Sequence, residues 1–184
     1  MKQNSVVIGI DPSLNSTGVC VWDGVRNVYY LLATHTTKKM TEISSRIENI
    51  TIVNIPKEHL EGTGVQQAIS QTKNITAIVR ELLDLLDIYE PERVIIEAPA
   101  FSASGRVADL AGLNHIIRYE CYRRGIDFYP LAPTNVKMQT VGNGQATKEM
   151  MVDTWLMIEP VAAPLRSCKC DDLADAWALC HYPI

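Results

Sequence analysis

The stretch VVIGIDPSLNSTGVCVW, residues 6–22, constrains the fold more than any other part of the sequence. Its two apolar runs are separated by Pro, Ser and Asn residues that favour a turn, so residues 6–11 and 17–22 are predicted to form a pair of strands. A third run, NVYYLLA at 27–33, extends the pair into an antiparallel meander. Asp11 closes the first strand, and a carboxylate in this position either caps the turn or belongs to a site.

The rest of the chain alternates between helical and extended patterns. Apolar residues recur at helical spacing from Val65 to Ile88, and RVIIEAPAF at 93–101 predicts a buried strand that ends at Glu97. Residues 34–63 predict only a short helix followed by a strand or a loop. The remaining expected elements are a helix over 107–124, a strand over 126–133, helices near 134–139 and 147–158, and a last helix from Asp171 to about His181.

Strands joined by a helical crossover are normally parallel. We therefore expect an α/β fold, in which a mixed five-stranded sheet of three antiparallel strands followed by parallel strands is flanked by helices. The 184 residues suffice for one sizeable core, so residues 1–184 are predicted to form a single domain.

Composition restricts the class of protein. No apolar stretch approaches the ~20 residues that cross a membrane, and five unevenly spaced cysteines favour a reduced, cytoplasmic setting. The net charge of −4 argues weakly against a protein that coats nucleic acid nonspecifically. A nuclease remains compatible with this charge, because a cluster of metal-binding carboxylates makes the total negative.

Four carboxylates are candidates for one site. Asp11 and Glu97 each end a predicted strand, and sites form at the carboxyl ends of strands in α/β sheets. Asp172 and Asp175, in DDLADAWALC, are three residues apart and share one helix face. Burying these acids together is unfavourable unless protonation or a cation relieves the repulsion. Two Mg²⁺ or Mn²⁺ ions about 4 Å apart would relieve it and would suit phosphodiester hydrolysis.

Each acid taken alone also has an ordinary structural interpretation. Strand-end Asp residues often cap turns, and Asp171 or Asp172 fits the cap of the last helix. The joint pattern of two strand-end acids and a helical pair favours the metal site.

Four motifs resemble, in order, the RuvC-type Holliday junction resolvases, which are RNase H-like nucleases: IGIDPSLNSTG, VIIEAPAF, LAPTNVKMQTVGNGQATKEMM and DDLADAWALC. The resemblance covers most of the chain except residues 34–63. It implies a homodimeric endonuclease that nicks two opposing strands of a four-way DNA junction, with two Mg²⁺ ions per active site and Mn²⁺ able to substitute. The implied ligands are Asp11, Glu97, Asp172 and Asp175, with Asp172 preferred to Asp171 because it stands three residues before Asp175.

The resemblance also implies contacts with DNA. Lys137 in PTNVK and Lys148 in NGQATK match lysines that contact phosphate or support the chemistry, although without the motif each is typical of a solvated helix face. The family commonly carries an aromatic residue three positions after the second acid. Here Phe101 comes one position later, and it either stacks on a base or fills the core.

Three further features bear on DNA binding and assembly. Gln145 lies in a flexible turn that would present it to the DNA backbone, and Arg118 either binds phosphate or ends a solvated helix. Two-fold DNA suits a two-fold protein, so a homodimer is expected. Its candidate interface lies on the helix 107–124, at Ala108, Ala111, Ile116 and Ile117.

Several alternatives stay open. One is an RNase H-like nuclease with broader branched-DNA, flap or RNA–DNA hybrid substrates; a non-catalytic junction-binding scaffold is another. An actin-like or sugar-kinase ATPase would need a longer chain. Cys168, Cys170, Cys180 and His181 are too irregularly spaced to predict a zinc site, so small buried hydrophobic residues are favoured there. A bacterial or phage-infected cell is the expected source, and the sequence identifies no motor partner.

Overall fold

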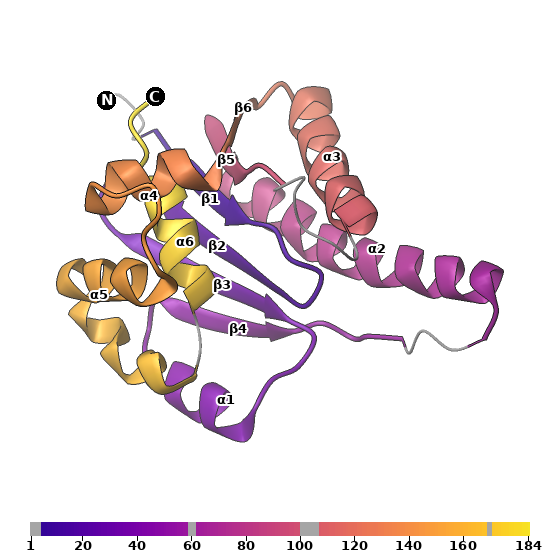
Figure 1. The fold of residues 1–184 in the computed structure, drawn as a ribbon, viewed down its shortest axis with the longest axis horizontal. Coiled ribbons are helices and arrows are strands. Elements are labelled where there is room, and N and C mark those ends of the chain that lie inside the picture. Colours follow the sequence, from indigo (N-terminus) through magenta and orange to yellow (C-terminus); the bar gives the residue numbers. More distant parts are fainter. Residues whose placement is uncertain (1–4, 59–61, 100–106, 169–170) are drawn as a thin grey trace.

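A single mixed sheet forms the centre of the computed structural model, which describes residues 5–58, 62–99, 107–168 and 171–184 (Figure 1). The strand order is β4-β3-β2-β1-β5-β6. In chain order the strands are β1 (Val7–Asp11), β2 (Ser16–Trp22), β3 (Asn27–Ala33), β4 (Ile50–Asn54), β5 (Arg93–Glu97) and β6 (Asp127–Leu131).

The sheet combines an antiparallel meander with parallel strands. β1 pairs antiparallel with β2, and β2 pairs antiparallel with β3. β5 pairs parallel with both β1 and β6. The chain passes from β5 to β6 through one helix, and such crossovers normally join parallel strands. The predicted α/β class and the predicted mixed order of strands are confirmed.

The sheet has one strand more than the five predicted. Residues 34–63 form the helix α1 (Lys38–Ser44) and the strand β4, which pairs parallel with β3 at the edge of the sheet. Ile50 is buried, whereas the other residues of β4 are partly or fully exposed. An edge strand of this kind gives a weak apolar pattern, which is why the sequence alone does not decide between a strand and a loop here.

Helices cover both faces of the sheet (Figure 1). One face carries α2 (Gly64–Tyr89) and α3 (Val107–Arg124), which pack on one core cluster. The other face carries α1, α4 (Pro133–Val141), α5 (Lys148–Ile158), the 3₁₀ helix η1 (Pro160–Cys168) and α6 (Asp171–Cys180), which pack on a second cluster. Among the described residues, no helix has the length and apolar character needed to cross a membrane.

The helix α6 lies directly on β1 and β2 because two strand positions carry glycine. A Cβ atom at Gly9 would lie 2.9 Å from Cys180 Cα, and one at Gly18 would lie 2.6 Å from the carbonyl carbon of Asp172. Glycine within a strand commonly marks such a close approach of backbone. Because Gly18 pairs with Asp11, the contact brings the start of α6 to the end of β1.

We expect Gly9→Ala to lower the free energy of unfolding by about 1–3 kcal/mol, because the added methyl group overlaps the backbone of α6. Urea unfolding measures the change. Gly112→Ala in α3 is the matched control: an added Cβ there meets no atom within 4 Å, and the substitution should stabilise the helix by about 0.5–1 kcal/mol. An equally stable Gly9→Ala protein would show that α6 does not rest on β1.

Candidate active site

Asp11 and Glu97 lie at the same edge of the sheet. They are the last residues of β1 and β5, which are parallel neighbours with Ile10 paired to Ile96. The next position along each strand is therefore an acid, and both acids lie where the two strands end. Each side chain is only partly exposed. The geometry matches the prediction that these two carboxylates meet.

The start of α6 adds two more acids to this edge. The backbone of Asp172 touches Gly18, the residue paired with Asp11, so the first turn of α6 lies beside the end of β1. Asp175 follows one turn later, and both side chains remain partly exposed while Leu173, Ala174 and Ala176 are buried in the core. The helix thus directs its acids to the edge and its apolar residues to the sheet.

Electrostatic coupling shows that the acids form one group. Burial, followed by the charges of Glu97, Asp175 and Asp172, raises the pKa of Asp11 well above its usual value. Burial and the charge of Asp175 raise the pKa of Glu97 to about 7.

The two acids of α6 are shifted in the same direction. Burial and the neighbouring charge of Asp172 raise the pKa of Asp175 to about 6. Burial also raises the pKa of Asp172, although a hydrogen bond with Ser16 partly offsets the shift. Keeping all of these acids ionised at neutral pH therefore requires a compensating positive charge.

The donor set fits a hard divalent cation. It consists of carboxylate oxygens, which Mg²⁺ and Mn²⁺ prefer. In the described part of the chain, no three of these carboxylates bring oxygen atoms within 4.8 Å of one another.

Lys148 supplies a positive charge at the rim of the acidic group. It is the first residue of α5, directly after Thr147, whose hydroxyl caps the helix by accepting from Met150 N–H. Its ammonium group forms an ion pair with Asp171 and lies 3.9 Å from Asp172 Oδ1. Burial alone would lower the pKa of Lys148, but the hydrogen bond to Asp171 and the nearby acid charges outweigh burial and raise it.

Lys137 is the second predicted lysine that the fold places near the acids. It lies on α4 and is half-buried. Its charge partly offsets the rise in the pKa of both Glu97 and Asp175. Lys148 thus acts electrostatically on all four carboxylates, and Lys137 acts on Glu97 and Asp175.

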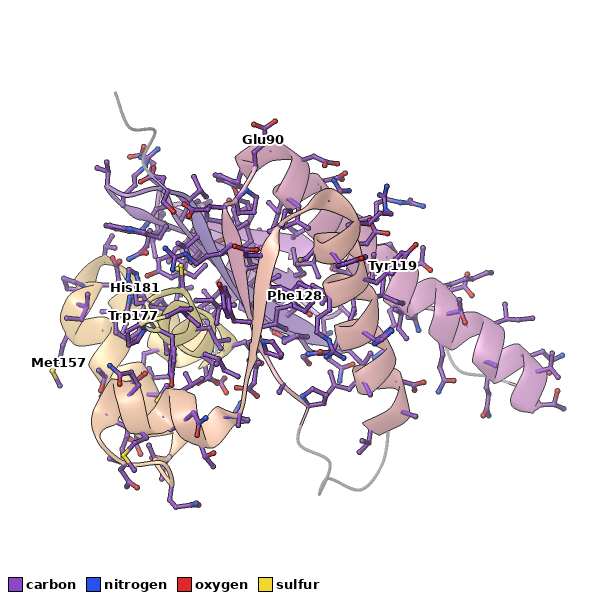
Figure 2. The ribbon with its side chains drawn as sticks, turned by 90° about the horizontal axis from the view of Figure 1, so that it is seen from above. Glu90, Tyr119, Phe128, Met157, Trp177 and His181 are labelled. Carbon is purple, nitrogen blue, oxygen red and sulfur yellow. The ribbon has the colours of Figure 1, made fainter. Side chains whose placement is uncertain are left out.

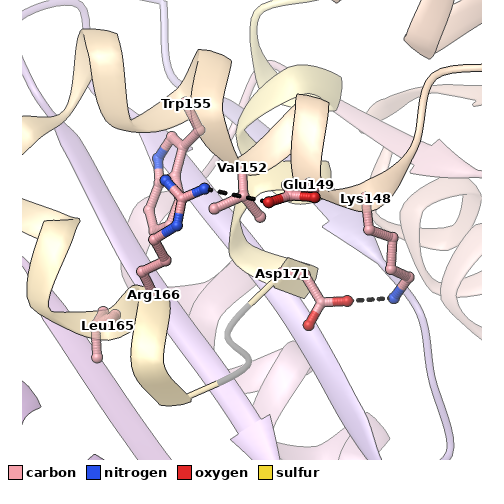
Figure 3. Close-up of a pocket in the computed structure, with 7 residues that line it drawn as sticks. All are labelled: Lys148, Glu149, Val152, Trp155, Leu165, Arg166 and Asp171. Carbon is pink, nitrogen blue, oxygen red and sulfur yellow. Dashed lines mark hydrogen bonds and ion pairs between the residues drawn. The ribbon is translucent and has the colours of Figure 1, made fainter.

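A hollow of about 340 Å³ extends from Lys148 along α5 (Figure 3). Asp171 and Lys148 pair at one end, and Arg166 lies 3.8 Å from Glu149 on its wall. Trp155, Val152 and Leu165 supply apolar surface. The hollow adjoins the acidic group through Lys148 and Asp171, which line it.

The other predicted DNA contacts lie in different places. Gln145 is exposed in the turn before α5, close in sequence to Lys148. Arg118 lies on α3, on the opposite face of the sheet from α6, where its guanidinium group is 3.4 Å from His115 Nδ1. Phe101 lies outside the described residues. DNA binding by these three residues stays a prediction.

Sequence reasoning missed several residues that support the site. Asn114 is buried and donates a hydrogen bond to the Glu97 backbone carbonyl oxygen at 2.7 Å, which fixes the end of β5. The sequence presents Asp171 as a helix cap or as the less favoured alternative to Asp172, whereas in the structure it pairs with Lys148. Glycine at positions 9 and 18, inside apolar strands, was the available signal for the close approach of α6.

Comparison with known proteins adds independent evidence. A family model described as "Crossover junction endodeoxyribonuclease RuvC" matches residues 58–181. A protein of that name from Helicobacter pylori (strain Shi470) is 28% identical over 177 residues, which cover 94% of this chain and 92% of the relative.

Solved structures show the same fold. "Thermus thermophilus RuvC structure" has a TM-score of 0.56 at 21% identity, covering 95% of this chain and 90% of that one. "T. thermophilus RuvC in complex with Holliday junction substrate" has a TM-score of 0.53 at 22% identity, covering 96% and 90%.

The raised pKa values predict how stability depends on pH. Between about pH 4 and about pH 7, the folded metal-free protein holds more protons on Glu97 and Asp175 than the unfolded chain does. Its free energy of unfolding should therefore fall as the pH rises through this window.

Added Mg²⁺ should raise the melting temperature more at about pH 8 than at about pH 5, because protons compete for the carboxylates.

Thermal unfolding with and without Mg²⁺ tests this expectation. Glu97→Gln should flatten the pH dependence, whereas Asp84→Asn, at an exposed acid on α2, should leave it unchanged. A metal-free protein whose stability rises steadily between about pH 5 and about pH 8 would contradict the coupling.

Proposed function

The chain belongs to the RuvC family of crossover junction endodeoxyribonucleases, and from this premise we propose that it resolves four-way DNA junctions by Mg²⁺-dependent phosphodiester hydrolysis, nicking opposing strands as a homodimer. Family membership makes the chain an endonuclease. The observation that carries the rest of the proposal is the convergence of Asp11, Glu97, Asp172 and Asp175 at one edge of the sheet. A relative of the same fold with a Holliday junction substrate supports the choice of DNA.

Asp11, Glu97, Asp172 and Asp175 would hold two Mg²⁺ or Mn²⁺ ions. When bound, these ions would supply an activated water for attack on phosphorus and a stabilising charge for the leaving oxygen. The four acids come from three separate elements, so the fold sets their positions before any ion arrives. Their raised pKa values reflect a group that is short of positive charge, which is the condition that a divalent cation relieves.

Lys148 and Lys137 would stabilise the phosphate. Asp171 holds the Lys148 ammonium group at the rim of the acids, where negative charge grows on the scissile phosphate during hydrolysis. Lys137 reaches the same acids from α4. Gln145, exposed in the turn between α4 and α5, would contact the sugar–phosphate backbone next to Lys148.

A homodimer would place two such sites on the two opposing strands. Exposed apolar side chains on α2 and α3 support an interface on that face of the molecule: Val65, Ile69, Ile116, Tyr119 and Tyr122. The expectation that Ile117 belongs to this interface is wrong, since Ile117 is buried in the core cluster beneath α3. Ala108 and Ile116 remain exposed and compatible with it.

Asp11→Asn should bind a four-way junction with nearly unchanged affinity in Ca²⁺ and should nick it roughly a hundredfold more slowly, or worse, in Mg²⁺. The reason is that the variant loses a metal ligand without losing the cationic surface. Asp84→Asn makes the same change of charge at a remote exposed acid and should cut normally. Wild-type nicking by Asp11→Asn would overturn the assignment of ligands.

The same assay on flap, RNA–DNA hybrid and linear duplex substrates tests the choice of DNA. The proposal requires faster cleavage of the four-way junction than of these competitors. Equal rates on all branched substrates would favour a nuclease of broader specificity within the same fold.

Substituting Asp171 and substituting Asp172 should slow nicking to very different extents, although the two residues are neighbours. Asp172→Asn removes a proposed metal ligand and should abolish most nicking, whereas Asp171→Asn only releases Lys148 and should slow nicking by roughly tenfold. Lys148→Ala should resemble or exceed Asp171→Asn. Nicking rates at saturating Mg²⁺ distinguish the two variants, and the reverse order of severity would assign the ligand to Asp171.

A further inference from the structure

A second group of metal-ligating side chains lies at the opposite end of α6 from the acids. Cys20 on β2, Cys180 at the last position of α6, and His181 bring their ligand atoms within 4.8 Å of one another. Among the described residues, no other three His, Cys, Asp or Glu side chains come this close together. The group shares no residue with the proposed active site.

The close contact between α6 and the sheet creates this group. Gly9 pairs with Cys20, and its missing side chain lets the backbone of Cys180 approach. Both thiols are buried. The Cys180 thiol donates to the Val7 carbonyl oxygen at 3.3 Å, and the Cys20 thiol faces Asn27 Oδ1 at 3.6 Å.

His181 lies on the solvent side of the two buried thiols. Its Nε2 lies 2.8 Å from Asn27 Oδ1, and its ring packs against Trp22 and Trp177 at centroid distances of 5.3 and 5.6 Å. Figure 2 shows His181 beside Trp177 on this side of the molecule. His181 is exposed, whereas the two thiols are buried beneath it.

Hydrogen bonds to Glu159 orient the Asn27 side chain beside the two thiols. Asn27 donates from Nδ2 to Glu159 Oε1 at 2.6 Å, so its side-chain oxygen is turned toward Cys20 and His181. The Tyr29 hydroxyl also donates to Glu159 Oε1, at 3.1 Å, and accepts from Trp155 Nε1. Carboxylates commonly orient the groups around a metal through such second contacts.

We propose that Cys20, Cys180 and His181 bind one structural Zn²⁺ ion, with Asn27 Oδ1 beside the fourth position. On binding, both thiol protons leave, and the imidazole donates a nitrogen lone pair. Two thiolates balance the charge of Zn²⁺, so the buried site is neutral. Sulfur and nitrogen ligands select zinc, whereas the oxygen ligands at the other end of α6 select magnesium.

The protonation of the side chains agrees with this chemistry. Burial raises the pKa of the Cys20 thiol well above its usual value, so the thiol stays protonated until a cation displaces the proton. Burial lowers the pKa of His181, which keeps the imidazole neutral and able to donate its lone pair.

The ion would fasten the end of α6 to β2. The same helix carries Asp172 and Asp175, so zinc at Cys180 stabilises the element that supplies two of the four acids. Cys20 is not among the candidate ligands that the sequence suggests, because it is remote in the chain from Cys180 and His181.

Freshly reduced protein titrated with Co²⁺ tests the proposal without reference to nuclease activity. A near-ultraviolet charge-transfer band, which arises from cobalt–thiolate bonds, should saturate at about one ion per chain. Zn²⁺ should then displace the cobalt and raise the melting temperature. Metal analysis of protein purified without chelators should find the same stoichiometry.

Matched variants locate the ion. Cys180→Ser should lose the band, and so should His181→Phe, which keeps an aromatic ring between the two tryptophans and thereby preserves packing. Cys121→Ser, at a buried thiol in the other core cluster, should retain it. Asp175→Asn should also retain it, which separates this ion from the acidic site. A reduced wild-type protein that gives no band, or a band that survives in folded His181→Phe and in Cys180→Ser, overturns the proposal.

Discussion

Repulsion among buried carboxylates is the constraint on which the site depends. The fold holds the acids together because the backbone of α6 rests on β1 and β2 at Gly9 and Gly18, where no side chain intervenes. Asp11 and Glu97 are fixed by the hydrogen bonding of parallel neighbours, and Asp172 and Asp175 are fixed by this helix. Burial and the repulsion among the carboxylates raise their pKa values, and a bound divalent cation would relieve this repulsion.

One short helix thus links two kinds of chemistry. Its first turns present carboxylate oxygens to the edge of the sheet, and its last residue presents a thiol to Cys20. The apolar residues between them, including Leu173, Ala176 and Leu179, are buried against the strands. The proposed zinc ion at one end and the proposed magnesium ions at the other would therefore both depend on the same packing of α6 against β1 and β2.

Much of the fold and the acids could be predicted from sequence because each rests on a local pattern. Strand-end acids after VVIGI and RVII, and the three-residue spacing of Asp172 and Asp175, are visible along the chain. The edge strand β4 could not be assigned, because its half-exposed residues lack a clear period. The ion pair of Lys148 with Asp171 and the proximity of Cys20 to Cys180 bring together residues far apart in sequence, so only the fold reveals them.

Anomalous diffraction from crystals grown with Mn²⁺ locates the ions that the account requires. We expect peaks among the carboxyl groups of Asp11, Glu97, Asp172 and Asp175 in the wild-type protein, and their loss in Asp175→Asn. Well-occupied Mn²⁺ elsewhere on the chain, with these four carboxyl groups free of metal, would contradict the central claim.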